Sequence, residues 1–169
     1  TRHYEMYPGE GRWVRPDKEI ESPDHTGDLG SSFPLDDLSF IYFLRQMDLE
    51  VGRSYSIPRY FKDDGNPVVI NVLRRELKKV DGGEFNTIVV QPIVQTDGLF
   101  GEGGEAEIYL TDDDRKIMVY MKSNIPRFPG ALELYLKDYQ PGVPLHPDAR
   151  EVAAEGRASR AQVDPATNR

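Results

Sequence analysis

The chain has 169 residues, no cysteine and a formal net charge of −8, with 29 acidic against 21 basic side chains. This length suits one domain with a sizeable core. The lack of cysteine excludes disulfides, thiolate nucleophiles and cysteine-based metal centres. The acidic balance disfavours nucleic acid and anionic lipid as partners, and no run approaches the ~18 apolar residues of a membrane helix.

The first residues predict a β-hairpin. Arg2–Tyr7 and Arg12–Arg15 are strand-like, and the Pro-Gly-Glu-Gly run between them is typical of a turn. Trp13 lies in the second strand close to Tyr4 and Arg15. Its indole is expected either to stack on a sugar or a protein partner, or to pack in the core.

A long loop and a helix follow. Pro16–Phe33 is rich in Pro, Asp, Gly and Ser and predicts a long surface loop. Pro34–Leu44 predicts the helix, because Pro and two Asp residues occupy its first turn and apolar residues follow helical spacing. The side chains expected to face the core are Leu35, Leu38, Ile41, Phe40, Tyr42 and Phe43.

The middle of the chain predicts a strand and then a long hairpin. Arg53–Phe61 is the strand, and Pro67–Val80 pairs with Phe85–Gln95 around the turn Asp81–Gly83. Pro92 has no N–H to donate, so it is expected at a bulge or a free edge.

Three further strands are predicted at Glu105–Leu110, Ile117–Lys122 and Ala131–Tyr139. With about eight short strands at this spacing, the expected fold is mainly β. We predict a curled antiparallel sheet or barrel over residues 1–140, with one short helix.

Residues 141–169 form the predicted second region, an extended or disordered C-terminal tail. They include no aromatic residue and balance four acidic against four basic side chains, so charge alone does not direct the tail to a partner. The side chains predicted to bind a partner are Trp13, Pro141, Val143, Leu145, Arg150, Val152, Arg157 and Arg160.

The sequence predicts no catalytic, cofactor or metal site. The glycine-rich run 101–104 lacks the Lys and Ser or Thr of a phosphate loop, and Asp112–Asp114 lacks the spacing of a calcium loop, which leaves a hairpin tip. His3, His25 and His146 are far apart in the sequence and do not have the spacing of a metal site. Glu105 and Glu107 would share a strand face, as in glycosidases, but one such pair is expected by chance among 29 acidic residues.

Several runs resemble a bacterial family, domain of unknown function 3108. They are Pro34 to Arg45, Leu49 to Tyr55, Arg59 to Phe61, Asn66 to Val68, Phe85 to Pro92, Gly98 to Glu107 and Met121 to Ser123. The resemblance covers roughly residues 1–139. It implies a curved antiparallel β domain, exported behind a signal peptide, in the periplasm or cell envelope and extrinsic to the membrane. The family has no established activity.

The resemblance also implies further strands ahead of the first hairpin. Because the chain begins at Thr1, we expect that an upstream part was removed. The edge near Arg2–Tyr7 would then be unpaired and open to another segment or subunit.

Three functions stay open, and we favour the first. It is a non-catalytic extrinsic or scaffolding subunit that binds protein subunits of a larger transport, secretion or photosynthetic membrane complex through loops, sheet edge and tail. The second is a periplasmic carrier for an apolar or glycan ligand, with a cavity lined by Phe61, Val90, Ile93, Leu99 and Phe100. The third is an envelope glycan hydrolase that uses Glu105 and Glu107.

Deletion of residues 141–169 is expected to leave the thermal transition nearly unchanged and to weaken retention in the complex. The reason is that the tail has little apolar area to bury against its own domain. Thermal unfolding and co-purification measure the two effects separately. A large fall in melting temperature would instead place the tail in the core.

Overall fold

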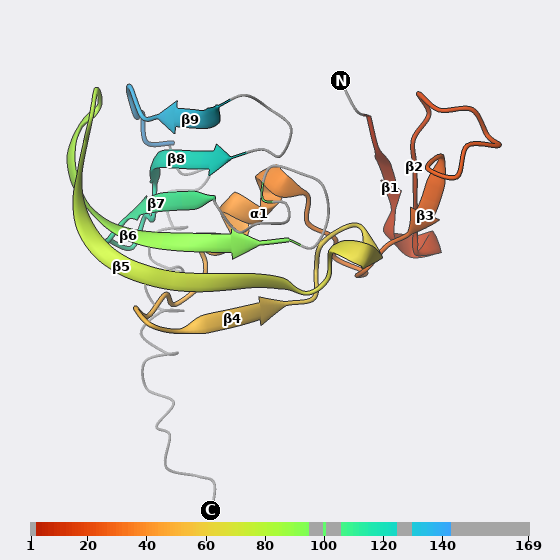
Figure 1. Ribbon diagram of the computed structural model, residues 1–169, viewed down its shortest axis with the longest axis horizontal. Coiled ribbons are helices and arrows are strands. Elements are labelled where there is room, and N and C mark those ends of the chain that lie inside the picture. Colours follow the sequence, from red (N-terminus) through yellow and green to blue (C-terminus); the bar gives the residue numbers. More distant parts are fainter. Residues whose placement is uncertain (1–2, 95–99, 101–105, 125–129, 143–169) are drawn as a thin grey trace, which may run out of the picture. The chain divides into compact units, whose positions relative to one another are not determined.

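The computed structural model describes residues 3–94, 100, 106–124 and 130–142. The chain divides into two compact units, Thr1–Asp138 and Tyr139–Arg169, and the elements described below all belong to the first. They form a three-stranded sheet, a six-stranded sheet and one α-helix within the described residues (Figure 1). The prediction of a mainly β fold is confirmed.

The three-stranded sheet contains the predicted hairpin. Strand β1 (Glu5–Tyr7) pairs with β2 (Arg12–Val14) across the short 3-10 helix η1 (Pro8–Glu10). Gly11 ends the turn with φ of 67°, a backbone conformation that glycine adopts without a Cβ penalty. The third strand, β3 (Thr26–Asp28), pairs with the other side of β2.

Strand β3 lies inside the segment predicted to be structureless, so that prediction was wrong over these residues. Arg15 holds the intervening loop closed: its guanidinium donates to Asp17 at 2.9 Å and to Asp24 at 2.7 Å. Its backbone N–H also donates to the carbonyl of His25 at 2.6 Å. These contacts bring residues 26–28 beside β2. Their sequence, Thr-Gly-Asp, has no strong strand propensity of its own.

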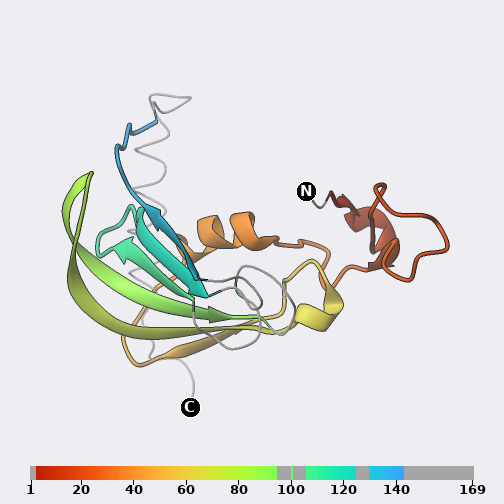
Figure 2. The ribbon, with the colours of Figure 1, turned by 45° about the horizontal axis from the view of Figure 1, so that its top comes forward.

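The second sheet is a meander in which each strand is antiparallel to the next. Its strands are β4 (Ser54–Ile57), β5 (Val68–Val80), β6 (Gly83–Ile93), β7 (Glu107–Thr111), β8 (Met118–Asn124) and β9 (Ala131–Tyr135). A second 3-10 helix, η2 (Asp63–Gly65), precedes β5. The strand order leaves β4 and β9 at the two ends, so the sheet is curled and not closed into a barrel. Figure 2 shows β5 and β6 bending together.

The helix α1 (Asp37–Leu44) forms where it was predicted. Asp36 accepts a hydrogen bond from the backbone of Ser39 at 2.7 Å, and the Ser39 hydroxyl accepts from the backbone of Asp36 at 2.8 Å. This reciprocal capping box satisfies two backbone donors at the helix start.

Helix α1 buries one face only. Phe40, Ile41 and Leu44 are buried, whereas Tyr42 is 67% exposed and Leu38 66% exposed. The expectation that Leu38 and Tyr42 face the core was therefore wrong. An eight-residue helix on one sheet can bury little more than a single stripe, and these two positions lie off that stripe.

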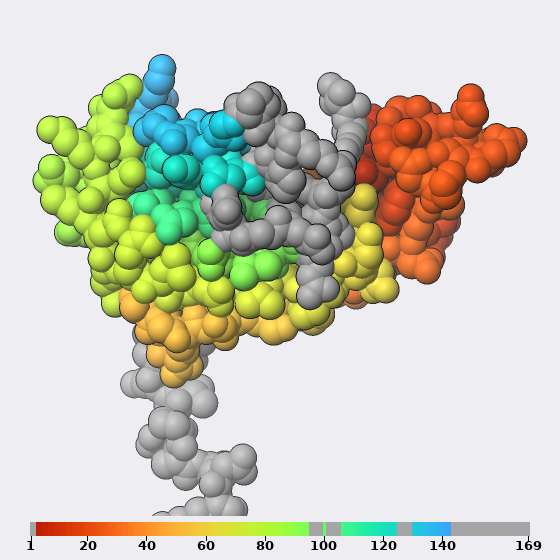
Figure 3. Space-filling model, viewed as in Figure 1, coloured from red at the N-terminus to blue at the C-terminus, as the bar shows by residue number. Residues whose placement is uncertain are grey.

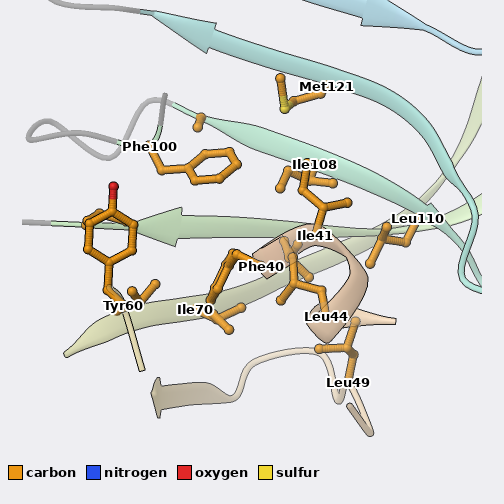
Figure 4. Packing of buried hydrophobic residues seen from close by; sticks show 14 of the residues in the cluster. Phe40, Ile41, Leu44, Leu49, Tyr60, Ile70, Phe100, Ile108, Leu110 and Met121 are labelled. Atoms are coloured by element: carbon orange, nitrogen blue, oxygen red, sulfur yellow. The ribbon is translucent and has the colours of Figure 1, made fainter. Parts of the chain in front are cut away.

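The main core lies between α1 and one face of the six-stranded sheet, which we call the helix face. Figure 4 shows α1 among sheet side chains that include Ile70 of β5, Ile108 of β7 and Met121 of β8. Phe40 also packs against Phe100, with ring centroids 6.1 Å apart. The sheet side chains of this core include Ile70, Val72, Ile88, Val90, Ile108, Leu110 and Met121.

A β-bulge between Val72 and Arg74 resets the alternation of β5. Val72 belongs to the core on the helix face, while Leu73 packs with a second cluster made by Val89, Tyr109 and Tyr120. We call the opposite face, which carries this cluster, the tyrosine face. The bulge thus places Leu73 and Arg74 on the same face of the sheet.

The β5–β6 hairpin turns tightly at Asp81 and Gly82, because Val80 pairs directly with Gly83. The Gly82 N–H donates to the Leu136 carbonyl just past β9 at 2.9 Å. A Cβ at Gly82 would lie 2.9 Å from that oxygen, so the close approach requires glycine. Pro92, at the other end of β6, pairs with Ile70 of β5 and lies beyond Val90, where the β6–β7 register ends.

Replacement of Phe40 by Ala is expected to lower the free energy of unfolding by about 3–5 kcal/mol, because it opens a cavity under α1. The matched control is Tyr42→Ala in the same helix, which is expected to cost about 0.5 kcal/mol or less. Urea denaturation measures both. Similar losses for the two variants would contradict the burial pattern of α1.

Candidate functional site

A cluster of ionisable side chains lies on the tyrosine face around Arg74. Its guanidinium donates to both oxygens of Glu107, at 2.9 and 3.0 Å, and through Nε to Glu76 at 2.6 Å. Tyr109 donates its hydroxyl proton to Glu107 at 2.8 Å. A bidentate pair of this geometry binds strongly and orients both partners.

These contacts keep Glu107 ionised. The hydrogen bonds from Arg74 lower the pKa of Glu107 more than any other interaction, and the hydroxyl of Tyr109 lowers it further. Burial, followed by the bond to Glu107, raises the pKa of Tyr109. A general acid needs a raised carboxyl pKa, so Glu107 is arranged as an acceptor in an ion pair.

A row of tyrosines crosses the same face from strand to strand. Tyr109 of β7 opposes Tyr120 of β8, which opposes Tyr135 of β9, and each pair has ring centroids 5.0 Å apart. The Lys78 ammonium lies 3.6 Å from the Tyr120 ring centroid and 4.6 Å from that of Tyr109. Burial, with nearby Glu133, raises the pKa of Tyr120 to about 12. The row therefore packs against the hairpin that carries Lys78.

The other polar motifs have structural partners. Asp113 accepts hydrogen bonds from the hydroxyl of Thr111 at 2.7 Å and the backbone of Arg115 at 3.0 Å, and Asp112 pairs with Arg75 at 2.8 Å. Asp112–Asp114 thus forms the hairpin tip that the sequence offered as an alternative to a calcium loop. No group of three or more metal-ligating side chains occurs in the described ranges.

An exposed apolar surface lies on the outer side of α1, and we call it the α1 patch. Leu38 and Tyr42 are four residues apart, so they adjoin on one helix face. Phe33 is 71% exposed in the preceding loop. Arg59 spans two rings of this surface, 5.9 Å from the centroid of Phe33 and 5.1 Å from that of Phe43. The patch consists of Phe33, Leu38, Tyr42 and Phe43, flanked by Arg45 and Arg59.

The edge of the six-stranded sheet at β4 is a second candidate surface. In the described part of the chain, β4 pairs with β5 and with no other strand. The orange-to-yellow atoms of this region lie along the lower margin of the face shown in Figure 3. An edge of this kind presents backbone donors and acceptors to another chain.

The comparisons with known proteins identify the family. The model described as "Protein of unknown function (DUF3108)" matches residues 9–137, which is well over half of the chain. The chain belongs to the DUF3108 family. Neither the curated proteins nor the solved structures gave a significant match.

Of the predicted partner-binding residues of this DUF3108 chain, the structure describes Trp13 and Pro141. Trp13 is only 8% exposed and makes an edge contact with Tyr4, with ring centroids 5.4 Å apart. Its alternative assignment to the core is confirmed. Pro141 is described and lies outside every strand and helix. The remaining residues, Val143, Leu145, Arg150, Val152, Arg157 and Arg160, lie outside the described residues.

The side chains proposed for a carrier cavity are mostly packed. Phe61, Val90 and Phe100 are buried, and all three belong to the core that contains α1. Leu99 lies outside the described residues, as does Glu105, the proposed partner of Glu107. Helix α1 therefore occupies the face of the DUF3108 sheet where a carrier would hold its ligand.

Sequence reasoning missed the α1 patch. It grouped Phe40, Tyr42 and Phe43 as one core stripe, but only Phe40 is buried. The available signal was the eight-residue length of α1, which limits how many positions can face the sheet. Arg59 follows α1 by 15 residues in the sequence, so the helical spacing of α1 could not predict its contact with Phe43.

Glu107→Gln is expected to destabilise this DUF3108 domain by about 1 kcal/mol at neutral pH, because Arg74 loses one of its two charged acceptors, keeps Glu76, and is partly exposed to water. The folded-state pKa of Glu107 is depressed, so its contribution is fully present above the unfolded pKa of about 4.3. It is lost as pH falls through the folded value.

Urea titrations from pH 7 to pH 3 measure the difference in unfolding free energy between wild type and variant, which should shrink at acidic pH. Glu84→Gln, on the exposed part of β6, is the matched control and should change little. If the difference between wild type and the Glu107→Gln variant stays constant over the whole pH range, the ion-pair assignment is contradicted.

Proposed function

We propose that this protein is a non-catalytic, membrane-extrinsic subunit that binds protein subunits of a larger cell-envelope complex. The larger complex is of the transport, secretion or photosynthetic class. The proposal includes contacts through the sheet edge, the loops and residues 141–169, and a location in the periplasm or cell envelope. The observation that carries it is the open edge at β4.

The β4 edge has a regular set of backbone groups for a partner strand. The Val72 N–H donates to the Arg53 carbonyl at 2.9 Å. Because hydrogen-bonded and non-bonded pairs alternate in an antiparallel ladder, Tyr55 and Ile57 direct their backbone groups to β5. Ser54 and Ser56 then direct theirs away from the sheet.

Within its four residues, β4 has no Lys, Pro or bulge to protect the edge. Soluble proteins block exposed edges with Lys, Pro or a bulge, whereas β4 reads Ser-Tyr-Ser-Ile with an uninterrupted register against β5. The Tyr55 hydroxyl also donates to the Asp48 carbonyl at 2.6 Å, which pins the preceding loop beside the strand. These features favour strand addition by a partner.

The ionisable groups support a binding role more than a catalytic one. The Arg74 cluster is satisfied by its own ion pairs and hydrogen bonds. The face that a carrier would use is filled by Phe40 and Leu44 of α1, which are 1% and 0% exposed. In the described part of the chain, no helix is both long and apolar enough to cross a membrane.

Ser56→Pro is expected to reduce complex retention and to leave the fold intact. Proline removes one N–H that faces away from β5, and proline is tolerated on edge strands. The tagged full chain is isolated from its native membranes in mild detergent, and size-exclusion chromatography with mass spectrometry reports the co-migrating subunits. Wild type should travel with integral membrane subunits in a fixed ratio.

Ser56→Ala is the matched control, because it changes the side chain and keeps the N–H. It should retain the complex as well as wild type does. Wild-type protein that migrates as a lone monomer would contradict the proposed function. Equal retention of the Pro and Ala variants would remove the β4 edge from the interface.

A further inference from the structure

The α1 patch is distinguished by the pairing of its arginines. Of the eight arginines that the structure describes, six form ion pairs with carboxylates, and Arg45 and Arg59 do not. The six are Arg12, Arg15, Arg53, Arg74, Arg75 and Arg115. In a chain with eight more acidic than basic side chains, two guanidinium groups without a carboxylate are notable. Arg45 lies against Tyr42, and Arg59 lies against Phe33 and Phe43.

Both guanidinium groups are held in place by neutral groups. Arg45 donates through Nε to the Arg115 carbonyl at 3.0 Å and lies 5.8 Å from the Tyr42 ring centroid. Arg59 donates through Nε to the Phe33 carbonyl at 3.0 Å and lies against two rings. In each residue the Nε–H is used, while no carboxylate among the described residues pairs with the charge. The two side chains are therefore oriented in advance for an anionic acceptor.

Three apolar side chains of the α1 patch are exposed. Leu38, Tyr42 and Phe33 are each about two-thirds or more exposed. Aromatic residues and arginine are the residue types that dominate the energetics of protein interfaces. A ligand that fits this surface has apolar side chains for the centre and carboxylates at the margin.

We infer that the α1 patch docks an acidic amphipathic segment of a protein partner, with its apolar side chains on Leu38 and Tyr42 and its carboxylates on Arg45 and Arg59. This inference rests on the proposed function and names the surface and the chemistry of the partner. It differs from strand addition, because side chains and not backbone groups make the contact.

The observations favour this occupant over a membrane or a second copy. Asp36 and Asp37 precede the exposed Leu38 at the start of α1, and the chain as a whole carries a charge of −8, so lipid phosphates would meet repulsion. A two-fold contact between two α1 patches would bring the same arginines toward each other. A short protein segment can place its carboxylates on Arg45 and Arg59 while it keeps clear of Asp36 and Asp37, which a continuous layer of lipid phosphates cannot do.

The test places the photo-crosslinking residue p-benzoylphenylalanine at Leu38 in the full chain, within its native membranes. We expect one predominant crosslink, to a segment in which Asp or Glu flanks apolar residues. Arg45→Glu with Arg59→Glu should reduce the crosslink about tenfold or more, since each removes a charge-paired contact. Arg45→Lys with Arg59→Lys should retain part of it. Reversal of the partner's carboxylates to Lys should restore the crosslink to the Glu variant.

Thermal unfolding checks that each variant is folded. If Arg59→Glu unfolds the domain, the test uses Arg45→Glu combined with Tyr42→Glu. Tyr42 is 67% exposed, so its replacement should leave the fold intact. Undiminished crosslinking in the folded reversal variants would overturn the inference, and so would a crosslinked segment without acidic residues. A crosslink to a second copy of this chain would also overturn it.

Vesicles of phosphatidylcholine with phosphatidylglycerol test the membrane directly. We expect no binding in a flotation assay, and binding that depends on Arg45 and Arg59 would overturn the inference. Failure of the proposed function is distinguishable, because wild type would then migrate alone. Failure of the inference alone would leave a complex that the reversal variants retain.

Discussion

The contact between α1 and the helix face is the constraint on which the rest of the structure depends. A curled, open sheet must cover its inner face, because unpaired apolar area on that side would be exposed to water. Phe40, Ile41 and Leu44 supply this cover from a helix of only eight residues. With these positions used for packing, Leu38 and Tyr42 have no sheet to face. The exposed patch is thus a geometric consequence of the way in which the core is closed.

The bulge in β5 separates the two faces of the sheet chemically. Before the bulge, Val72 adds to the apolar core under α1; after it, Arg74 lies on the tyrosine face and reaches Glu107. Lys78 of the hairpin packs on the tyrosine row, and the hairpin tip donates through Gly82 to the Leu136 carbonyl just past β9. One face is therefore stabilised by apolar packing, and the other combines a small apolar cluster with directed hydrogen bonds.

Patterns that are local in the sequence predicted the fold well. Asp36 and the apolar spacing after it indicated α1, and the Asp-Gly-Gly turn between two β-prone runs indicated the β5–β6 hairpin. Strand β3 was not predictable, because it depends on the clasp of Arg15 with Asp24 and on pairing with β2. The α1 patch was not predictable for a similar reason, since Arg59 meets Phe33 and Phe43 only in the folded chain.

The distribution of charge connects the fold to the proposed role. Six of the described arginines pair with carboxylates of this acidic chain, and the pairs of Arg15, Arg74 and Arg75 join segments that are distant in the sequence. Arg45 and Arg59 are held instead by carbonyl groups and aromatic rings, which leave their charge without a carboxylate partner among the described residues. Such ordering does not neutralise the charge. It does lower the entropic cost for a carboxylate that arrives from another chain, which is the behaviour expected of a binding surface.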